Sequence, residues 1–199
     1  MKSSFIAVSA LLIGLSMPAL ADSNDNKSTI DQIGTASSAD VTQTGMDNKN
    51  RATVKQGALP SQTGNSVTMM QAGENNDNLS TVFQFGDDHE ATVTQDGNDN
   101  FNHSVLTQAG ANGTAEIHQG GDSNVNSSEV RIQAGTDNTL TLDQFGDNNA
   151  NTSFISTFSH STDVDVQQHG SGNMNDSIVH TGMAPSSATY NSSVTVDQH

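Results

Sequence analysis

A seven-residue frame with a defined residue type at every second position recurs fourteen times in this chain, and this repetition limits the fold more than any other feature. Seven frames follow Asn-x-Ser-x-apolar-x-Gln with small departures, and they start at Asn26, Asn50, Asn78, Asn102, Asn126, Asn151 and Asn175. Seven others alternate with them, carry Ala, Val or Leu at the third position, and start at Ser37, Asn65, His89, Gly113, Asn138, Thr162 and Ser192. Equivalent frames are most often 24 residues apart. Such a repeat is typical of solenoids, in which each unit packs only against its neighbours.

The period of two within each frame predicts β-strands that turn one side inward. None of the 56 inward positions, four in each of fourteen frames, is Asp, Glu, Lys or Arg, and His89 is the only titratable residue among them. This distribution fits burial, because an unpaired buried charge is costly. In the fifth frame Val130 is followed by Ile132 and Gln133, and we interpret the extra residue as a β-bulge before Gln133. The predicted fold class is all-β: a two-sheet parallel β-solenoid of cross-β type with seven coils of about 24 residues and two strands in each coil.

Stacked coils place identical inward side chains above one another, so the inward polar residues are the candidate functional residues. An amide side chain has two donor hydrogens and an acceptor oxygen, and amides at the strand spacing can bond to both neighbours. Burial without partners would cost ~1–3 kcal/mol for each amide. Thr157 and Thr181 replace Gln in the last two frames of the first set, where we expect local weakening. The predicted amyloid-core ladder consists of Asn26, Ser28, Gln32, Gln43, Asn50, Gln56, Gln71, Asn78, Ser80, Gln84, Gln95, Asn102, Ser104, Gln108, Gln119, Asn126, Gln133, Gln144, Asn151, Gln168, Asn175 and Gln198.

The arcs between frames carry the signals of tight turns. Gln-x-Gly opens ten of the thirteen arcs, and glycine supplies the positive φ that such turns require. Pro60 and Pro185 fall in the two longest arcs, 57–64 and 182–191, as expected for a residue that cannot donate to a strand ladder. The predicted turn glycines are Gly34, Gly45, Gly73, Gly86, Gly97, Gly110, Gly121, Gly135, Gly146 and Gly170.

The first residues have the pattern of an export signal. Lys2 precedes an apolar stretch, 5–15, and Ala19-Leu20-Ala21 forms a small-x-small cleavage site. The stretch is shorter than the ~20 residues of a membrane-spanning helix. We therefore expect a signal peptide at 1–21, a short segment at 22–25 and the repeat solenoid at 26–199.

Composition excludes several classes of function. Without residues 1–21 the chain has 5 basic and 22 acidic residues, a net charge of −17, which disfavours a nucleic-acid partner. Cysteine is absent, so no disulfide can brace the fold. We find no nucleophile, acid–base pair or phosphate loop at a spacing that would indicate an enzyme, and we expect no cofactor. The seven histidines match no metal-ligand motif.

Two other β-solenoid functions must be weighed. Arcs such as Gly121-Asp122-Ser123-Asn124 are similar to calcium-binding β-rolls but lack their nonapeptide period, so we interpret them as solvated turns. Outward threonines recur as in ice-binding solenoids, but residues such as Asp40, Glu116 and Phe154 interrupt the threonine columns. A monomeric solenoid that binds ice or another surface therefore stays an alternative.

The motifs also resemble those of a known family. Gln95-x-Gly97 preceded by Ala91, and Asn50-x-Ala52 leading to Gln56, resemble the curlin repeat of curli fibre subunits, and the resemblance covers 26–199. It implies a structural subunit of an extracellular cell-surface amyloid fibre that serves adhesion, aggregation and biofilm formation. It also implies periplasmic chaperones, secretion through an outer-membrane pore and a companion curlin subunit. A minor nucleator of the same fibre is an alternative.

The positions of the first and last frames bear on assembly. The frames begin at Asn26 and end at Gln198, so we expect both end strands to be exposed. Uncovered strand edges template further pairing. A head-to-tail contact of this kind does not close on itself, and it therefore predicts a homopolymeric fibre.

Overall fold

The computed structural model describes residues 25–57, 62–135, 138–157, 162–172, 174–181 and 192–198. The predicted signal peptide at 1–21 lies outside the described residues, as do Pro60 and Pro185. Within the described ranges, no helix has the length and apolarity needed to cross a bilayer.

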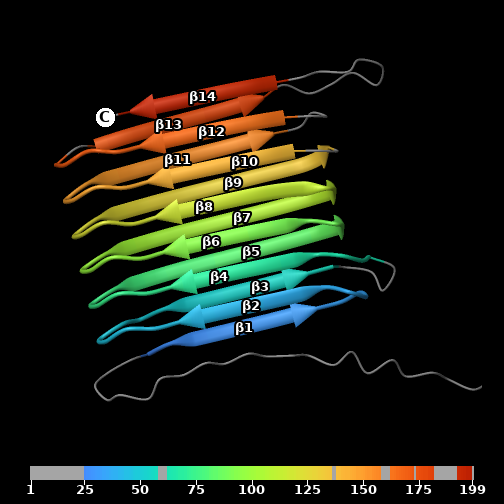
Figure 1. Cartoon of the computed structure of the whole chain (residues 1–199), viewed down its shortest axis with the longest axis horizontal. Helices are drawn as coiled ribbons and strands as arrows, with labels where there is room; N and C mark the ends of the chain where they lie inside the picture. The colour runs from blue at the N-terminus through green and yellow to red at the C-terminus, as the bar shows by residue number, and fades with distance from the viewer. Residues whose placement is uncertain are drawn as a thin grey trace, which may run out of the picture.

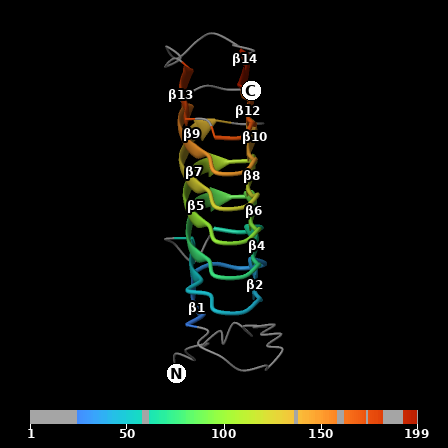
Figure 2. The same ribbon diagram turned by 90° about the vertical axis from the view of Figure 1, so that its left-hand side faces the viewer.

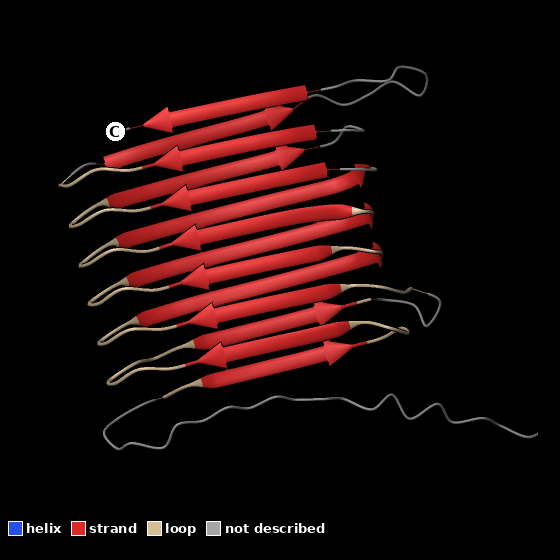
Figure 3. Ribbon diagram, viewed as in Figure 1, coloured by secondary structure: helices blue, strands red, loops and turns tan. Residues whose placement is uncertain are grey.

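In the described residues, fourteen β-strands follow one another, one for each predicted frame (Figures 1 and 3). The odd-numbered strands are β1 (Lys27–Gln32), β3 (Arg51–Gln56), β5 (Asp77–Asp87), β7 (Phe101–Ala111), β9 (Val125–Gly135), β11 (Ala150–Thr157) and β13 (Met174–Thr181). The even-numbered strands are β2 (Ser38–Gln43), β4 (Ser66–Gln71), β6 (Glu90–Gln95), β8 (Gly113–Gln119), β10 (Asn138–Gln144), β12 (Thr162–Gln168) and β14 (Ser192–Gln198). Strands β5, β7 and β9 extend beyond their frames into the following arcs.

The odd and even strands form two separate seven-stranded sheets, in the orders β1-β3-β5-β7-β9-β11-β13 and β14-β12-β10-β8-β6-β4-β2. Every strand pairs in parallel with the equivalent strands of the neighbouring coils; Thr53, for example, lies beside Thr29 and Thr81. The two sheets face each other as two thin layers (Figure 2). The predicted two-sheet parallel β-solenoid is therefore confirmed, with six turns from β1 to β13 and a last half-turn to β14.

The space between the sheets is filled by one narrow apolar core. Branched residues from the odd strands, such as Val82 and Leu106, share this core with residues such as Val93 and Ile117 from the even strands. Full burial of a side chain of this size contributes ~1.5–3 kcal/mol. No Asp, Glu, Lys or Arg is buried among the described residues, as the inward frame positions require.

The pairing of β7 with β9 corrects the predicted position of the inserted residue. Ile132, which is 1% exposed, lies beside Gln108 and occupies the inward position assigned to Gln133. Gln133 lies beside Ala109 on the outward side, and the register shifts only after this pair. The prediction for Gln133 was therefore wrong. Alternation continues without interruption from Asn126 to Ile132, which buries the apolar side chain, and the extra residue is accommodated at the arc, where strand pairing ends.

Candidate functional site

The glutamines of the even-numbered strands form one continuous series of hydrogen bonds. Each Nε2 donates to the Oε1 of the glutamine in the next coil towards the C-terminus, over distances of 2.7 to 2.9 Å. The same Nε2 atoms also donate across the core to backbone carbonyls of the other sheet, as Gln71 does to Arg51 (3.1 Å). Each amide thus connects neighbouring coils and also the two sheets. The series consists of Gln43, Gln71, Gln95, Gln119, Gln144, Gln168 and Gln198.

The glutamine series of the odd-numbered strands is shorter. Gln32, Gln56, Gln84 and Gln108 are joined by Nε2–Oε1 bonds of 2.5 to 2.9 Å. The series ends at Gln108 because Ile132 occupies the next coil. Gln108 Nε2 donates instead to the carbonyls of Gly113 (2.9 Å) and Glu90 (3.1 Å), so the end of the series leaves its donors paired.

The predicted asparagine column forms only in part. Asn126 Nδ2 donates to Asn102 Oδ1 and Asn151 Nδ2 donates to Asn126 Oδ1, both at 2.9 Å. Asn50 and Asn78 are 0% exposed, yet neither side-chain nitrogen nor oxygen has a hydrogen-bond partner. Asparagine has one fewer side-chain torsion than glutamine, so its amide adjusts less to reach the next coil. The prediction of a complete asparagine ladder was wrong.

The remaining predicted polar residues are placed as follows. Ser104 Oγ donates to Ser80 Oγ at 2.9 Å, so these two serines join adjacent coils. Asn26 and Ser28 in the first coil are only half-buried, because β1 is the end strand of its sheet and no described strand pairs with its outer edge. In the last odd-numbered strand, Asn175 Nδ2 donates to the His169 carbonyl at 3.4 Å.

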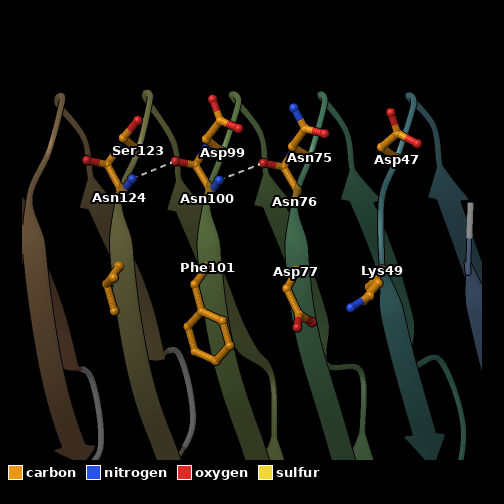
Figure 4. A pocket seen from close by; sticks show the side chains of 11 residues that line it. Asp47, Lys49, Asn75, Asn76, Asp77, Asp99, Asn100, Phe101, Ser123 and Asn124 are labelled. Carbon is orange, nitrogen blue, oxygen red and sulfur yellow. Dashed lines mark hydrogen bonds between the residues drawn. The ribbon is translucent and has the colours of Figure 1, made fainter. Parts of the chain in front are cut away.

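The wide arcs that follow the even-numbered strands contain a second asparagine column, which the sequence analysis missed. The backbone N–H of each later member donates to the Oδ1 of the member before it, at 2.8 to 2.9 Å (Figure 4). Each Nδ2 donates to a glycine carbonyl of the next coil at 2.5 to 2.7 Å. It also donates within its own arc to the carbonyl four residues earlier, at 2.9 to 3.1 Å. The column consists of Asn48, Asn76, Asn100, Asn124 and Asn149.

These arc asparagines are buried, so the interpretation of the wide arcs as solvated turns was wrong for Asn124. In each of these five wide arcs an asparagine follows the turn glycine by three residues, as in Gly97-x-x-Asn100, and this was the signal available in the sequence. Asn76, Asn100 and Asn124 of this column line a groove of about 340 Å³ along the arcs. Figure 4 shows Asp99 on one side of this groove and Phe101 and Asp77 on the other.

The turn glycines allow successive arcs to approach closely. A Cβ atom at Gly73 or Gly97 would collide with the glycine carbonyl of the next coil and crowd the arc asparagine. The residue before each arc asparagine, such as Asp99 (φ +54°), adopts the left-handed conformation that Asn and Asp tolerate best. Gly135 ends β9. The other nine predicted turn glycines have φ values between +101° and +140°: Gly34, Gly45, Gly73, Gly86, Gly97, Gly110, Gly121, Gly146 and Gly170.

In a narrow arc, His89 accepts a hydrogen bond from a backbone N–H of the next coil, as the arc asparagines do in the wide arcs. The acceptor here is an imidazole nitrogen instead of an amide oxygen. It is 1% exposed, and its Nδ1 accepts a hydrogen bond from the Gly113 N–H at 3.1 Å. Its own N–H donates to Asn65 Oδ1 at 3.1 Å. Burial lowers the pKa of His89 below its ordinary value, against the opposing influence of nearby backbone groups and of Asp87. An accepting Nδ1 also requires the neutral ring.

We predict that the His89→Asn variant will be less sensitive to acid than the wild-type chain. Because the folded state lowers the pKa of His89 from 6.5, its stabilising contribution is complete above that pH and declines as the pH falls below it. Asparagine occupies the equivalent positions 65 and 138, and it keeps an acceptor without a titration. Thermal unfolding at pH 7.5 and 5.0 measures the difference. An equal loss of stability in both chains would contradict the prediction.

Both ends of the described solenoid have unpaired strand edges. Within the described ranges, β1 and β2 pair only with β3 and β4, and β13 and β14 pair only with β11 and β12. Inward residues at these ends, such as Ile30 and Val196, are only partly buried, whereas their equivalents in the middle coils are buried. Edges of this kind accept further strands.

Comparison with known proteins agrees with the residues and the fold. The curlin associated repeat matches the chain at residues 63–97 and again at 76–110. No curated protein and no solved structure matches the chain significantly. The described residues contain no group of three or more His, Asp or Glu side chains placed to hold a metal ion. The chain is therefore similar to the curlin associated repeat over residues 63–110, which lie within the two-sheet parallel solenoid.

Proposed function

We propose that the chain is a structural subunit of an extracellular curli-type amyloid fibre, in which copies stack end to end and serve cell adhesion, aggregation and biofilm formation. The observation that carries this proposal is the pair of unpaired parallel edges at opposite ends of the solenoid. The strands lie across the stacking direction, so a stack of copies would be a cross-β fibre.

Stacking would place chemically similar inward positions together at each junction. Val179 and Val196 of one copy would meet Ile30 and Val41 of the next if the pairing continued in register. Burial of the partly exposed Ile30 and Val196 and the pairing of two further strand edges both favour assembly. The net charge of −17 opposes it, because every described carboxylate lies on the outer surface or in an arc.

The family supports the finer parts of the proposal. The curlin family is structural and non-enzymatic, and we propose no catalytic activity for this chain. We also propose export with the help of periplasmic chaperones, passage through an outer-membrane secretion pore, and growth on the cell surface beside a companion curlin subunit.

We predict that the chain without its predicted signal peptide, residues 22–199, will form fibres on its own. This segment includes all fourteen strands. Electron microscopy should show unbranched fibres, and fibre diffraction should give a meridional reflection near 4.7–4.8 Å. A chain that stays monomeric for days at high micromolar concentration would contradict the proposed function.

A further inference from the structure

We propose that two pairs of side chains on the outer face of the odd-numbered sheet set the register between successive copies. Asp176 of one copy pairs with Lys27 of the next, and His180 of the first pairs with Asp31 of the second. This inference rests on the proposed end-to-end stacking and specifies the junction that such stacking requires.

The register of the strands places these residues in common columns. One outward column runs through Lys27, Arg51, Leu79, His103, Ser127, Thr152 and Asp176. A second runs through Asp31, Lys55, Phe83, Thr107, Arg131, Ser156 and His180. A further β1 added to β13 in the same register lies with Lys27 beside Asp176 and with Asp31 beside His180.

Within one copy, the two charges of the first pair lack the partner that the junction would supply. Lys27 lies beside the cation Arg51, which itself pairs with Asp77 at 3.3 Å. Asp176 lies beside Thr152. Neither Lys27 nor Asp176 makes an ion pair with any described residue. Each end therefore carries a charge whose complement lies at the opposite end of the molecule.

The two charge pairs distinguish the correct register of the added strand from registers shifted by two residues. A shift of the added strand by two residues would keep its apolar side inward, because the side-chain period is two. Such a shift would place Lys27 beside Met174 or Ile178 and would lose both pairs. Only the unshifted register makes both pairs at once.

The charge of the whole rod favours the same head-to-tail arrangement. Residues 25–56 contain four Asp and four Lys or Arg, a net charge of zero, whereas residues 150–198 contain four Asp and no Lys or Arg. Tail-to-tail contact would bring two acidic ends together, and head-to-tail contact would bring an acidic end to a neutral one. Opposite potentials select partners and fix orientation in this way.

The even-numbered sheet contributes the other half of the junction. Every glutamine from Gln43 to Gln168 donates towards the C-terminal end, so Gln198 Nε2 of one copy is oriented towards Gln43 Oε1 of the next. In the odd-numbered sheet Thr181 would meet Gln32, and that glutamine series does not continue. The charge pairs therefore lie on the sheet that lacks the amide bond.

The test compares Lys27→Glu, Asp176→Lys and the double variant of residues 22–199, each as monomer added to its own sonicated fibres at low salt. We expect each single variant to elongate roughly 3- to 10-fold more slowly than the wild type, because one exposed attraction becomes a repulsion. The double variant, which restores opposite charges, should return to within about twofold of the wild-type rate. Lys49→Glu makes the same change of charge in the first wide arc, outside both junction columns, and should slow growth less.

A further experiment adds the same monomer variant to two kinds of fibre, so that differences in monomer folding cannot affect the comparison. Lys27→Glu monomers should elongate Asp176→Lys fibres faster than they elongate Lys27→Glu fibres, since only the former fibres present a cation at position 176 to the new carboxylate at position 27. Equal rates on both fibres, or a double variant as slow as the singles, would overturn the junction while leaving the fibre intact. A wild-type chain that forms no fibres would instead overturn the proposed function.

Discussion

The Gly97→Ala variant is expected to lose about 3 kcal/mol or more of its free energy of unfolding. At φ +101° an L-residue is strained, and the new Cβ would collide with the carbonyl of Gly121 in the next coil. The same Cβ would crowd Asn100 Nδ2, which donates to that carbonyl at 2.5 Å. Urea unfolding followed by circular dichroism measures the loss, and fibre elongation should slow with it.

Gly172 offers the matched control. It has φ +70°, and a Cβ built there meets no atom within 4 Å. Asparagine tolerates this left-handed conformation, so Gly172→Asn should change stability by less than about 1 kcal/mol. If Gly97→Ala and Gly172→Asn unfold at the same urea concentration, close stacking of the arcs is not what requires glycine at position 97.

The Gln95→Ala variant is expected to be destabilised by about 4 kcal/mol. Gln95 accepts from Gln71 at 2.8 Å and donates to Gln119 at 2.9 Å, so its removal leaves one buried N–H of Gln71 and the buried Oε1 of Gln119 without a partner. The cavity adds to the loss. Thr94→Ala, a change at the partly exposed neighbour, should stay within about 0.5 kcal/mol of the wild type.

Gln95→Met separates hydrogen bonding from volume. Methionine fills a similar space but offers no amide, so one N–H of Gln71 and the Oε1 of Gln119 still lose their partner. We expect this variant to keep more than half of the destabilisation caused by alanine, as measured by urea unfolding. A methionine variant with wild-type stability would show that the glutamine column acts by packing alone.

The strands and their register could be predicted from the sequence because burial constrains them strongly. A shift of one residue would place the charges of most strands in the core, so the absence of charge from the inward positions indicates one pairing. Glutamine recurs at the last inward position of most frames, and its longer side chain reaches the next coil at every described step of the even-numbered sheet.

The predictions for Gln133 and for the wide arcs were wrong because each position was assigned from its residue type alone. Gln133 has the residue type of the column, but uninterrupted alternation from Asn126 places Ile132 there instead. The arc asparagines were missed because the frames end before the arcs begin. Buried backbone groups in a tight arc need partners just as those of a strand do, and Asn100 supplies them through both ends of its side-chain amide.

Because each coil contacts only its neighbours in register, the length of the rod is independent of its local structure. Glu90 lies beside Thr114, so excision of residues 90–113 would join His89 directly to Thr114 with every column still continuous. In-frame duplication of the same segment would add a coil without requiring any new kind of contact. Recombination between repeats in the gene can therefore lengthen or shorten the protein by whole coils, and the number of coils becomes a quantity that selection can tune separately from the fold.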